Sequence, residues 1–153
     1  MTILRQEQIL PISIEQAWDF FSSPANLNII TPESMKFSFQ SKLPENIYSG
    51  LVIHYKISPF PFMRVKWTTK ITDVEKHVFF ADEQLKGPYA YWRHEHYFTR
   101  VDGGVKITDI VNYKIGKSMF GWIAGKLFVH NRVKEIFKFR REKLVDLFSK
   151  SKS

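Results

Sequence analysis

The chain lacks several features that would assign it to a well-defined class of protein. None of its 153 residues is cysteine, so disulfide bonds, thiolate metal sites and a cysteine nucleophile are excluded. No apolar run approaches the roughly 18 residues that a membrane-spanning helix needs. Residues 1–7 also lack the uninterrupted apolar segment of a secretory signal. We therefore expect a protein of the cytoplasm without a transmembrane helix.

Two motifs that mark many active sites are absent as well. The chain has no Gly-x-Ser-x-Gly sequence, which presents the nucleophilic serine of many hydrolases. It has no glycine-rich loop that could cradle a phosphate. Hydrolysis through a serine elbow and nucleotide binding through a phosphate loop are therefore not expected.

The positive charge of the chain is concentrated near its C-terminus. The net charge is +8, and segment 117–152 holds ten basic residues against three acidic ones. Such a segment can meet an anionic membrane or nucleic acid, but we interpret Lys134, Lys138 and Arg141 as the solvated face of a helix. Phe137 and Phe139 in this segment are better explained by helix packing than by stacking on bases, so we expect no nucleic acid partner. Membrane contact remains the less favoured alternative.

What the chain has in excess is aromatic residues, with 14 Phe, 6 Tyr and 4 Trp, which fill cores and line apolar pockets. Apolar and polar residues alternate along seven segments, which predicts seven β-strands. The predicted strands are 3–10, 35–39, 51–57, 65–72, 77–85, 92–98 and 107–113.

Helical patterns flank these strands. Ser13 and Gln16 have the spacing of a capping box at the start of a short helix, and Pro24 suits the first turn of a second one over 25–30. Apolar residues then follow helical spacing over 120–148, which predicts a helix of roughly 43 Å.

Together these elements predict an α+β fold. A curved antiparallel sheet of seven strands would grip the long C-terminal helix, with two short helices after the first strand. We expect a single domain over 1–148 and a frayed tail over 149–153. Sheet and helix cannot close fully on each other along this length, so a cavity is expected between them.

Titratable residues share faces with apolar ones on two neighbouring predicted strands. Side chains two residues apart on a strand point to the same face. One strand therefore presents Trp92, His94, His96 and Phe98 together, and the next presents Ile107, Asp109, Val111 and Tyr113. This mixture suits the wall of a cavity better than a solvent face or a dry core.

The cluster of His94, His96 and Asp109 allows two interpretations. It can be a buried hydrogen-bonded network that fixes strand register and pocket shape, which we favour. It can also supply a general acid or base, so these three are the candidate catalytic residues. A zinc site with His54 or Asp109 as third ligand is disfavoured, because His54 falls on the opposite alternation of its strand. We expect neither a metal nor a cofactor.

Four short segments have a distinctive combined pattern. They are Pro11-x-x-x-Glu15-x-Ala17-Trp18-x-Phe20-Phe21, Pro24-x-Asn26-Leu27 with Thr31-Pro32, Asp82-x-Gln84-x-x-Gly87-Pro88-Tyr89, and Trp92-x-His94-x-His96-x-Phe98 leading to Asp109-x-Val111-x-Tyr113. This pattern resembles the helix-grip superfamily of START lipid-transfer domains, birch-pollen allergens and bacterial polyketide cyclases and dehydratases, collectively SRPBCC domains. Within it, the chain looks like the small stand-alone bacterial proteins.

The resemblance implies a hydrophobic cavity between sheet and long helix, and this fold hosts carriers, sensors and enzymes alike. We expect this protein to be a carrier or sensor that binds a hydrophobic or aromatic small molecule in the cavity. The alternative is a cyclase- or dehydratase-like enzyme that uses the His/Asp cluster. The expected ligand-binding residues are Phe37, Tyr55, Trp67, Trp92, His94, His96, Phe98, Asp109 and Tyr113.

Overall fold

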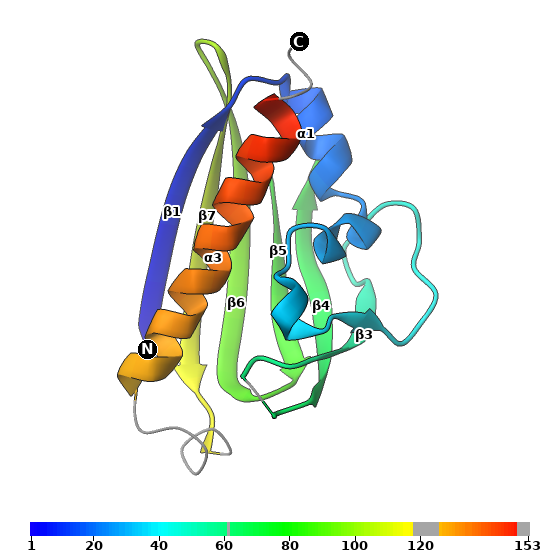
Figure 1. Cartoon of the computed structure of the whole chain (residues 1–153). Coiled ribbons are helices and arrows are strands. Elements are labelled where there is room, and N and C mark those ends of the chain that lie inside the picture. The colour runs from blue at the N-terminus through cyan, green and yellow to red at the C-terminus, as the bar shows by residue number, and fades with distance from the viewer. Residues whose placement is uncertain (61, 118–125, 150–153) are drawn as a thin grey trace.

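The computed structural model describes residues 1–60, 62–117 and 126–149. The fold is α+β, as predicted: a curved antiparallel sheet of seven strands in the order β1-β7-β6-β5-β4-β3-β2 grips a long C-terminal helix, α3 (Figure 1). The strands are β1 (Thr2–Leu10), β2 (Ser38–Phe39), β3 (Val52–Ile57), β4 (Val65–Glu75), β5 (Phe79–Lys86), β6 (Tyr89–Val101) and β7 (Gly104–Ile115). The helices are α1 (Ile14–Phe21), the 3-10 helices η1 (Pro24–Asn28) and η2 (Glu33–Met35), and α3 (Lys126–Ser149).

Strands β6 and β7, which contain the two neighbouring strands predicted from alternation, form an antiparallel hairpin with a turn at Gly103 and Gly104. Their register places His96 opposite Asp109 and His94 opposite Val111. In the turn, Gly103 has a φ of +84° and Gly104 a φ of +156°. A side chain at Gly104 would collide with the backbone carbonyl of Leu10, so the close approach of β1 to this turn requires glycine.

The predicted capping box begins α1. The Ser13 hydroxyl accepts a hydrogen bond from the Gln16 backbone N–H at 3.1 Å, and the Gln16 side chain accepts one from the Ser13 N–H at 3.0 Å. The buried face of α1 carries Trp18, whose ring meets that of Phe98 on β6 edge to face at 5.3 Å. The helix expected over 25–30 is the shorter 3-10 turn η1.

The strand predicted over 35–39 is wrong in its first half. Met35 ends η2, and Lys36 has a left-handed φ of 48°, so extended pairing begins only at Ser38. The Lys36 carbonyl accepts a hydrogen bond from Arg64, which stabilises this kink. Alternation alone cannot reveal such a break.

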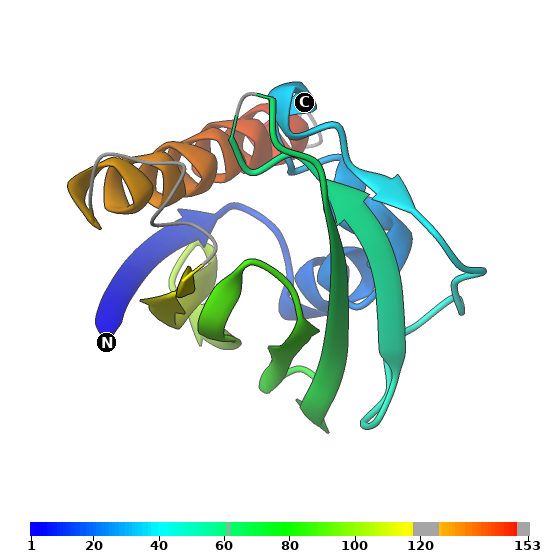
Figure 2. The same cartoon turned by 90° about the horizontal axis from the view of Figure 1, so that it is seen from below.

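Helix α3 lies across the open side of the curved sheet (Figure 2). It buries Val129, Val133, Phe137 and Leu144, a stripe of helical period. Leu127 and Phe128 belong to the apolar pattern predicted over 120–148, but they lie two and one positions before Val129, off this stripe, and are 72% and 52% exposed. The predicted helical residues 120–125 and the tail residues 150–153 lie outside the described residues, while Ser149 is helical.

Hydrogen bonds fasten α3 to the edge strand β1. The side-chain amides of Gln6 and Gln8 donate to the carbonyls of Phe137 and Arg141 at 3.2 and 2.8 Å, and Arg141 donates to the Glu7 carbonyl. On the far side, Arg132 donates to the Pro59 carbonyl and the Ser34 hydroxyl. No helix in the described part of the chain is long and apolar enough to cross a membrane.

Candidate functional site

A cavity of about 180 Å³ lies between the sheet and the helices. Its walls come from β3 to β6, from α3, and from α1 and the segment that follows it. Its apolar and aromatic lining includes Phe21, Leu27, Ile30, Met35, Phe37, Ile53, Tyr55, Ile57, Trp67, Ile71, Phe80, Tyr89, Trp92, Val133, Ile136 and Phe137. Its charged and imidazole side chains are Asp82, His94, His96 and Arg140. Ser23, Asn26, Thr31 and Thr69 add neutral polar groups. The cavity is therefore mainly apolar, and its charged and imidazole groups lie in one cluster.

Aromatic rings form a continuous wall on the sheet side of the cavity. Phe37 stacks on Tyr55 with ring centroids 4.6 Å apart, and Tyr55 stacks on Trp67 at 6.0 Å. Trp67 then meets Trp92 edge to face at 5.4 Å. The Trp67 indole nitrogen is buried and has no hydrogen-bond partner within the described part of the chain. Such a wall can accept planar apolar groups.

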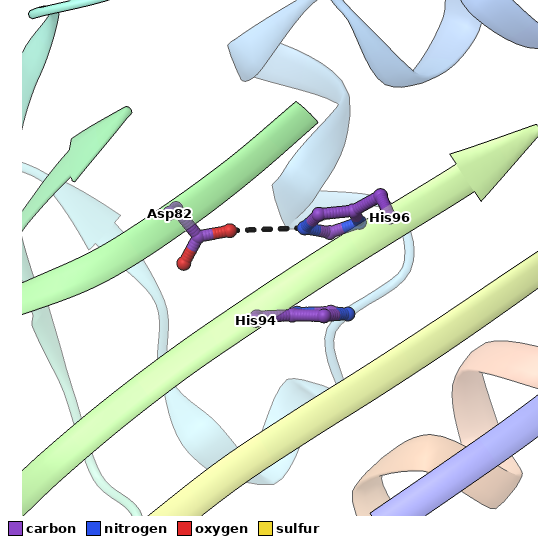
Figure 3. Close-up of side chains that lie close together, drawn as sticks. All are labelled: Asp82, His94 and His96. Carbon is purple, nitrogen blue, oxygen red and sulfur yellow. Dashed lines mark hydrogen bonds and ion pairs between the residues drawn. The ribbon is translucent and has the colours of Figure 1, made fainter. Parts of the chain in front are cut away.

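The polar cluster begins with two histidines on β6 and an aspartate on the neighbouring strand β5. Alternation on β6 turns His94 and His96 to the same face, where their rings stack at a centroid distance of 3.6 Å (Figure 3). The His96 Nε2 lies 2.9 Å from an Asp82 carboxylate oxygen. The His94 Nε2 lies 2.8 Å from Asp109 Oδ1 on β7. Each histidine therefore has its own carboxylate partner.

Arg140 of α3 completes the cluster from the helix side. Its Nη2 lies 3.0 Å from Asp109 Oδ1 and 3.4 Å from His96 Nδ1. The guanidinium also lies over the rings of Phe21 and Phe137, at 5.3 and 5.9 Å, a placement that favours a cation. Helix and sheet are thus joined by a buried ion pair.

These contacts determine where the proton of His96 lies. A guanidinium can only donate, so the His96 Nδ1 accepts from Arg140. The neutral His96 ring then carries its hydrogen on Nε2, and this N–H donates to Asp82. His94 likewise donates its Nε2–H to Asp109.

The environment shifts the pKa values of the two aspartates in opposite directions. Burial raises the pKa of Asp109, but the charge of Arg140 and the hydrogen bond from His94 outweigh burial and hold this pKa well below its usual range. Burial also raises the pKa of Asp82, and there the charges of His94 and Arg140 offset it only in part. For His96, burial and the charges of His94 and Arg140 lower the pKa well below its usual value. The cluster therefore holds one firmly ionised carboxylate and one that binds a proton more readily.

Three of these groups have metal-ligating atoms close together. The ligand atoms of Asp82, His94 and His96 all lie within 4.8 Å of one another. The third group is therefore Asp82 and not His54, whose Nδ1 lies 3.0 Å from the Thr68 hydroxyl at an exposed site. A metal ion there would lie against the fixed charge of Arg140, which already occupies the second nitrogen of His96. The donor set fits a proton better than a divalent cation.

Six of the nine residues expected to bind a ligand line the cavity, and three do not. The lining residues are Phe37, Tyr55, Trp67, Trp92, His94 and His96. Phe98 packs instead with Trp18 in the core under α1. Asp109 lies behind His94, and the Tyr113 hydroxyl faces α3, 2.6 Å from the His130 Nδ1.

Sequence reasoning missed the roles of two charged residues in the cluster. Arg140 follows Val133 and Phe137 by seven and three positions and precedes Leu144 by four, so it falls on the buried stripe of α3. A charged residue on such a stripe is a signal that could have been read. Asp82 follows Phe80 by two and shares its face, but the irregular register between β4 and β5 obscures that alternation.

The curved seven-stranded sheet around the long C-terminal helix defines the class: the chain has the helix-grip fold. No family model and no curated protein matches the sequence. Solved structures do match. Protein Ms6760 from Mycobacterium smegmatis is 16% identical with a TM-score of 0.69, over 97% of this chain and 92% of that one.

Two further structures extend the comparison. Protein CV1439 from Chromobacterium violaceum is 12% identical with a TM-score of 0.70, over 95% of this chain and 96% of that one. The allergen Ara h 8.0201, of the birch-pollen type, is 18% identical with a TM-score of 0.60, over 95% and 98% of the two chains. At these identities the structural likeness shows that the fold is shared, and nothing more.

Proposed function

We propose that this protein binds a hydrophobic or aromatic small molecule in the cavity between the sheet and α3, as a carrier or a sensor. The observation that carries the proposal is a mainly apolar, ring-lined cavity whose charged and imidazole side chains form one cluster on its wall. Ligand pockets commonly combine such a lining with a few polar groups that orient the ligand. An apolar cavity of about 150 Å³ binds benzene, so 180 Å³ suits one substituted ring.

The expected affinity follows from the apolar area involved. About 200 Å² of ligand surface and a similar area of cavity wall would contribute about 10 kcal/mol at 25 cal/mol per Å². Loss of translational and rotational freedom offsets at least about 4 kcal/mol of this. A dissociation constant of about tens of micromolar follows, without any chemistry.

Native mass spectrometry of the purified protein, followed by denaturing extraction, tests the proposal. A small apolar molecule retained by the wild type should be lost from Ile136→Trp, which fills the cavity from α3. The control is Val145→Trp, which places the same ring on the same helix at a position that is 48% exposed. Retention of the molecule by both variants would contradict the proposal. So would a failure of added ligand to bind at micromolar concentration to either the wild type or the control.

A second candidate function rests on the Asp82–His96 pair. This pair lies on the cavity wall, and a cyclase- or dehydratase-like reaction needs a general acid or base in contact with substrate. Asp109 is then a positioning group, because it does not line the cavity itself and acts on it through His94, Arg140 and His96, whose Nδ1 lies 3.5 Å from its carboxylate. The test is whether the extracted ligand changes on incubation with wild type but not with Asp82→Asn. Equal turnover by both proteins excludes this mechanism.

A further inference from the structure

We infer that the cavity selects a ligand whose polar group is a hydroxyl, and that Asp82 sets this preference by rejecting carboxylates. The inference rests on the proposed function and adds the chemical class of the ligand. It follows from how the charges of the cluster are distributed between its interior and the cavity wall.

The charge of Asp109 is neutralised within the protein. It has Arg140 Nη2 at 3.0 Å and His94 Nε2 at 2.8 Å, and its side chain is only 4% exposed. Arg140 Nη2 donates to Asp109 and to His96, so the positive charge of Arg140 is likewise paired with Asp109, while its buried Nε has no hydrogen-bond partner among the described residues. Because the two charges of this pair cancel, its net attraction for an anion in the cavity is small.

Asp82, in contrast, lies on the cavity wall without a cationic partner of its own. Among the described residues no lysine or arginine forms an ion pair with it, and its one strong contact is the neutral N–H of His96 at 2.9 Å. Within residues 1–60, 62–117 and 126–149, its other oxygen accepts only a long hydrogen bond of 3.4 Å from the Thr69 hydroxyl. Because a carboxylate can accept about four hydrogen bonds, Asp82 retains acceptor capacity toward the cavity. Its side chain is 19% exposed, compared with 6% for His96.

A ligand hydroxyl next to Asp82 would donate to this open acceptor, and bonds to charged groups are among the stronger ones. A ligand carboxylate would instead bring a second negative charge into an apolar cavity, where like charges disfavour each other's ionised form. Tyr55 already shows this effect, since burial and then the charge of Asp82 raise its pKa well above the usual value. Phenolic groups in this cavity are therefore held in the O–H form that can donate.

Three ligands of similar size separate these effects: toluene, p-cresol and p-toluate, titrated by calorimetry at pH 7. Against wild type, p-cresol should bind at least about tenfold more tightly than toluene, and p-toluate at least about tenfold more weakly. In Asp82→Asn the preference for p-cresol over p-toluate should fall at least about tenfold. The amide keeps an oxygen that can accept from His96, so this variant should fold. Asp73→Asn makes the same change at an exposed site on β4 and should leave the preference unchanged.

The outcomes separate the two proposals. Binding of toluene without discrimination, or a preference for p-cresol that Asp82→Asn leaves intact, overturns the assignment to Asp82 and leaves the proposed cavity function standing. Tighter binding of p-toluate than of p-cresol overturns it as well. Failure of all three ligands to bind wild type overturns the proposed function itself, and the inference with it.

Discussion

Replacing Arg140 by methionine should strongly destabilise the fold, because it would leave Asp109 as a buried charge without a cation. The pair is 3.0 Å apart, and its side chains are 6% and 4% exposed. Breaking a buried pair by removing one partner costs about 3–5 kcal/mol. Methionine is apolar and flexible enough to occupy much of the guanidinium's volume, so most of this loss would reflect the unpaired carboxylate. We expect a decrease of this size in the free energy of unfolding.

Urea unfolding, followed by tryptophan fluorescence and circular dichroism, measures the change as a shift in midpoint at constant slope. The matched control is Arg100→Met. Arg100 pairs with Glu15 at 2.8 Å, but the two side chains are 68% and 56% exposed. An exposed pair contributes about 0–1 kcal/mol, so distance alone would wrongly predict similar effects for the two substitutions.

The double variant Arg140→Met/Asp109→Asn provides a second check. It removes both charges, so it should be more stable than Arg140→Met alone even though it carries one more substitution. A loss in Arg140→Met no larger than that in Arg100→Met would refute the argument. So would a double variant less stable than the single one, since the unpaired charge would then not be the cause.

Three further predictions concern pH, capping and the β6–β7 turn. The folded pKa of His96 lies well below its usual value of 6.5, so its contribution to stability is present above about pH 6.5 and is lost as the pH falls toward the folded pKa. The urea midpoint of His96→Gln should therefore fall less than that of wild type between pH 7.5 and 5.5. The decrease for His54→Gln, at an exposed site, should equal the decrease for wild type. Ser13→Ala should lower the free energy of unfolding by about 1 kcal/mol through loss of the cap; a thermal melt that does not shift would contradict this. Gly104→Ala should cost more than about 2 kcal/mol because its Cβ would meet backbone, whereas Gly103→Ala has open space and should cost about 1–2 kcal/mol for its positive φ; equal losses in urea would argue against the collision.

The sequence was sufficient for the fold because the signals that specify it are local. Alternation indicated all seven strands, of which the one over 35–39 is extended only in its second half, and the Ser13–Gln16 spacing identified the start of α1. The break at Lys36 could not be read, since it depends on a carbonyl held by Arg64 from 28 residues away. Long-range contacts of this kind leave no periodic trace.

The candidate site was predicted only in part for the same reason. His94 and His96 share a face with Trp92, which alternation reveals. Which carboxylate each histidine meets depends on pairing between strands: Asp82 comes from β5 and Asp109 from β7. The sequence therefore indicated His94, His96 and Asp109 as members of the cluster, but not Asp82 or Arg140, and not which members face the cavity.

The two sets of hydrogen bonds on α3 differ in a way that bears on ligand entry. Along β1 the helix is tied by backbone carbonyls to Gln6 and Gln8 and by Arg141, whereas toward the β3–β4 turn and η2 its hydrogen bonds among the described residues come from Arg132 alone. For α3 to move away from the β3–β4 turn, the hydrogen bonds of Arg132 to Pro59 and Ser34 would have to break, whereas those along β1 could stay intact.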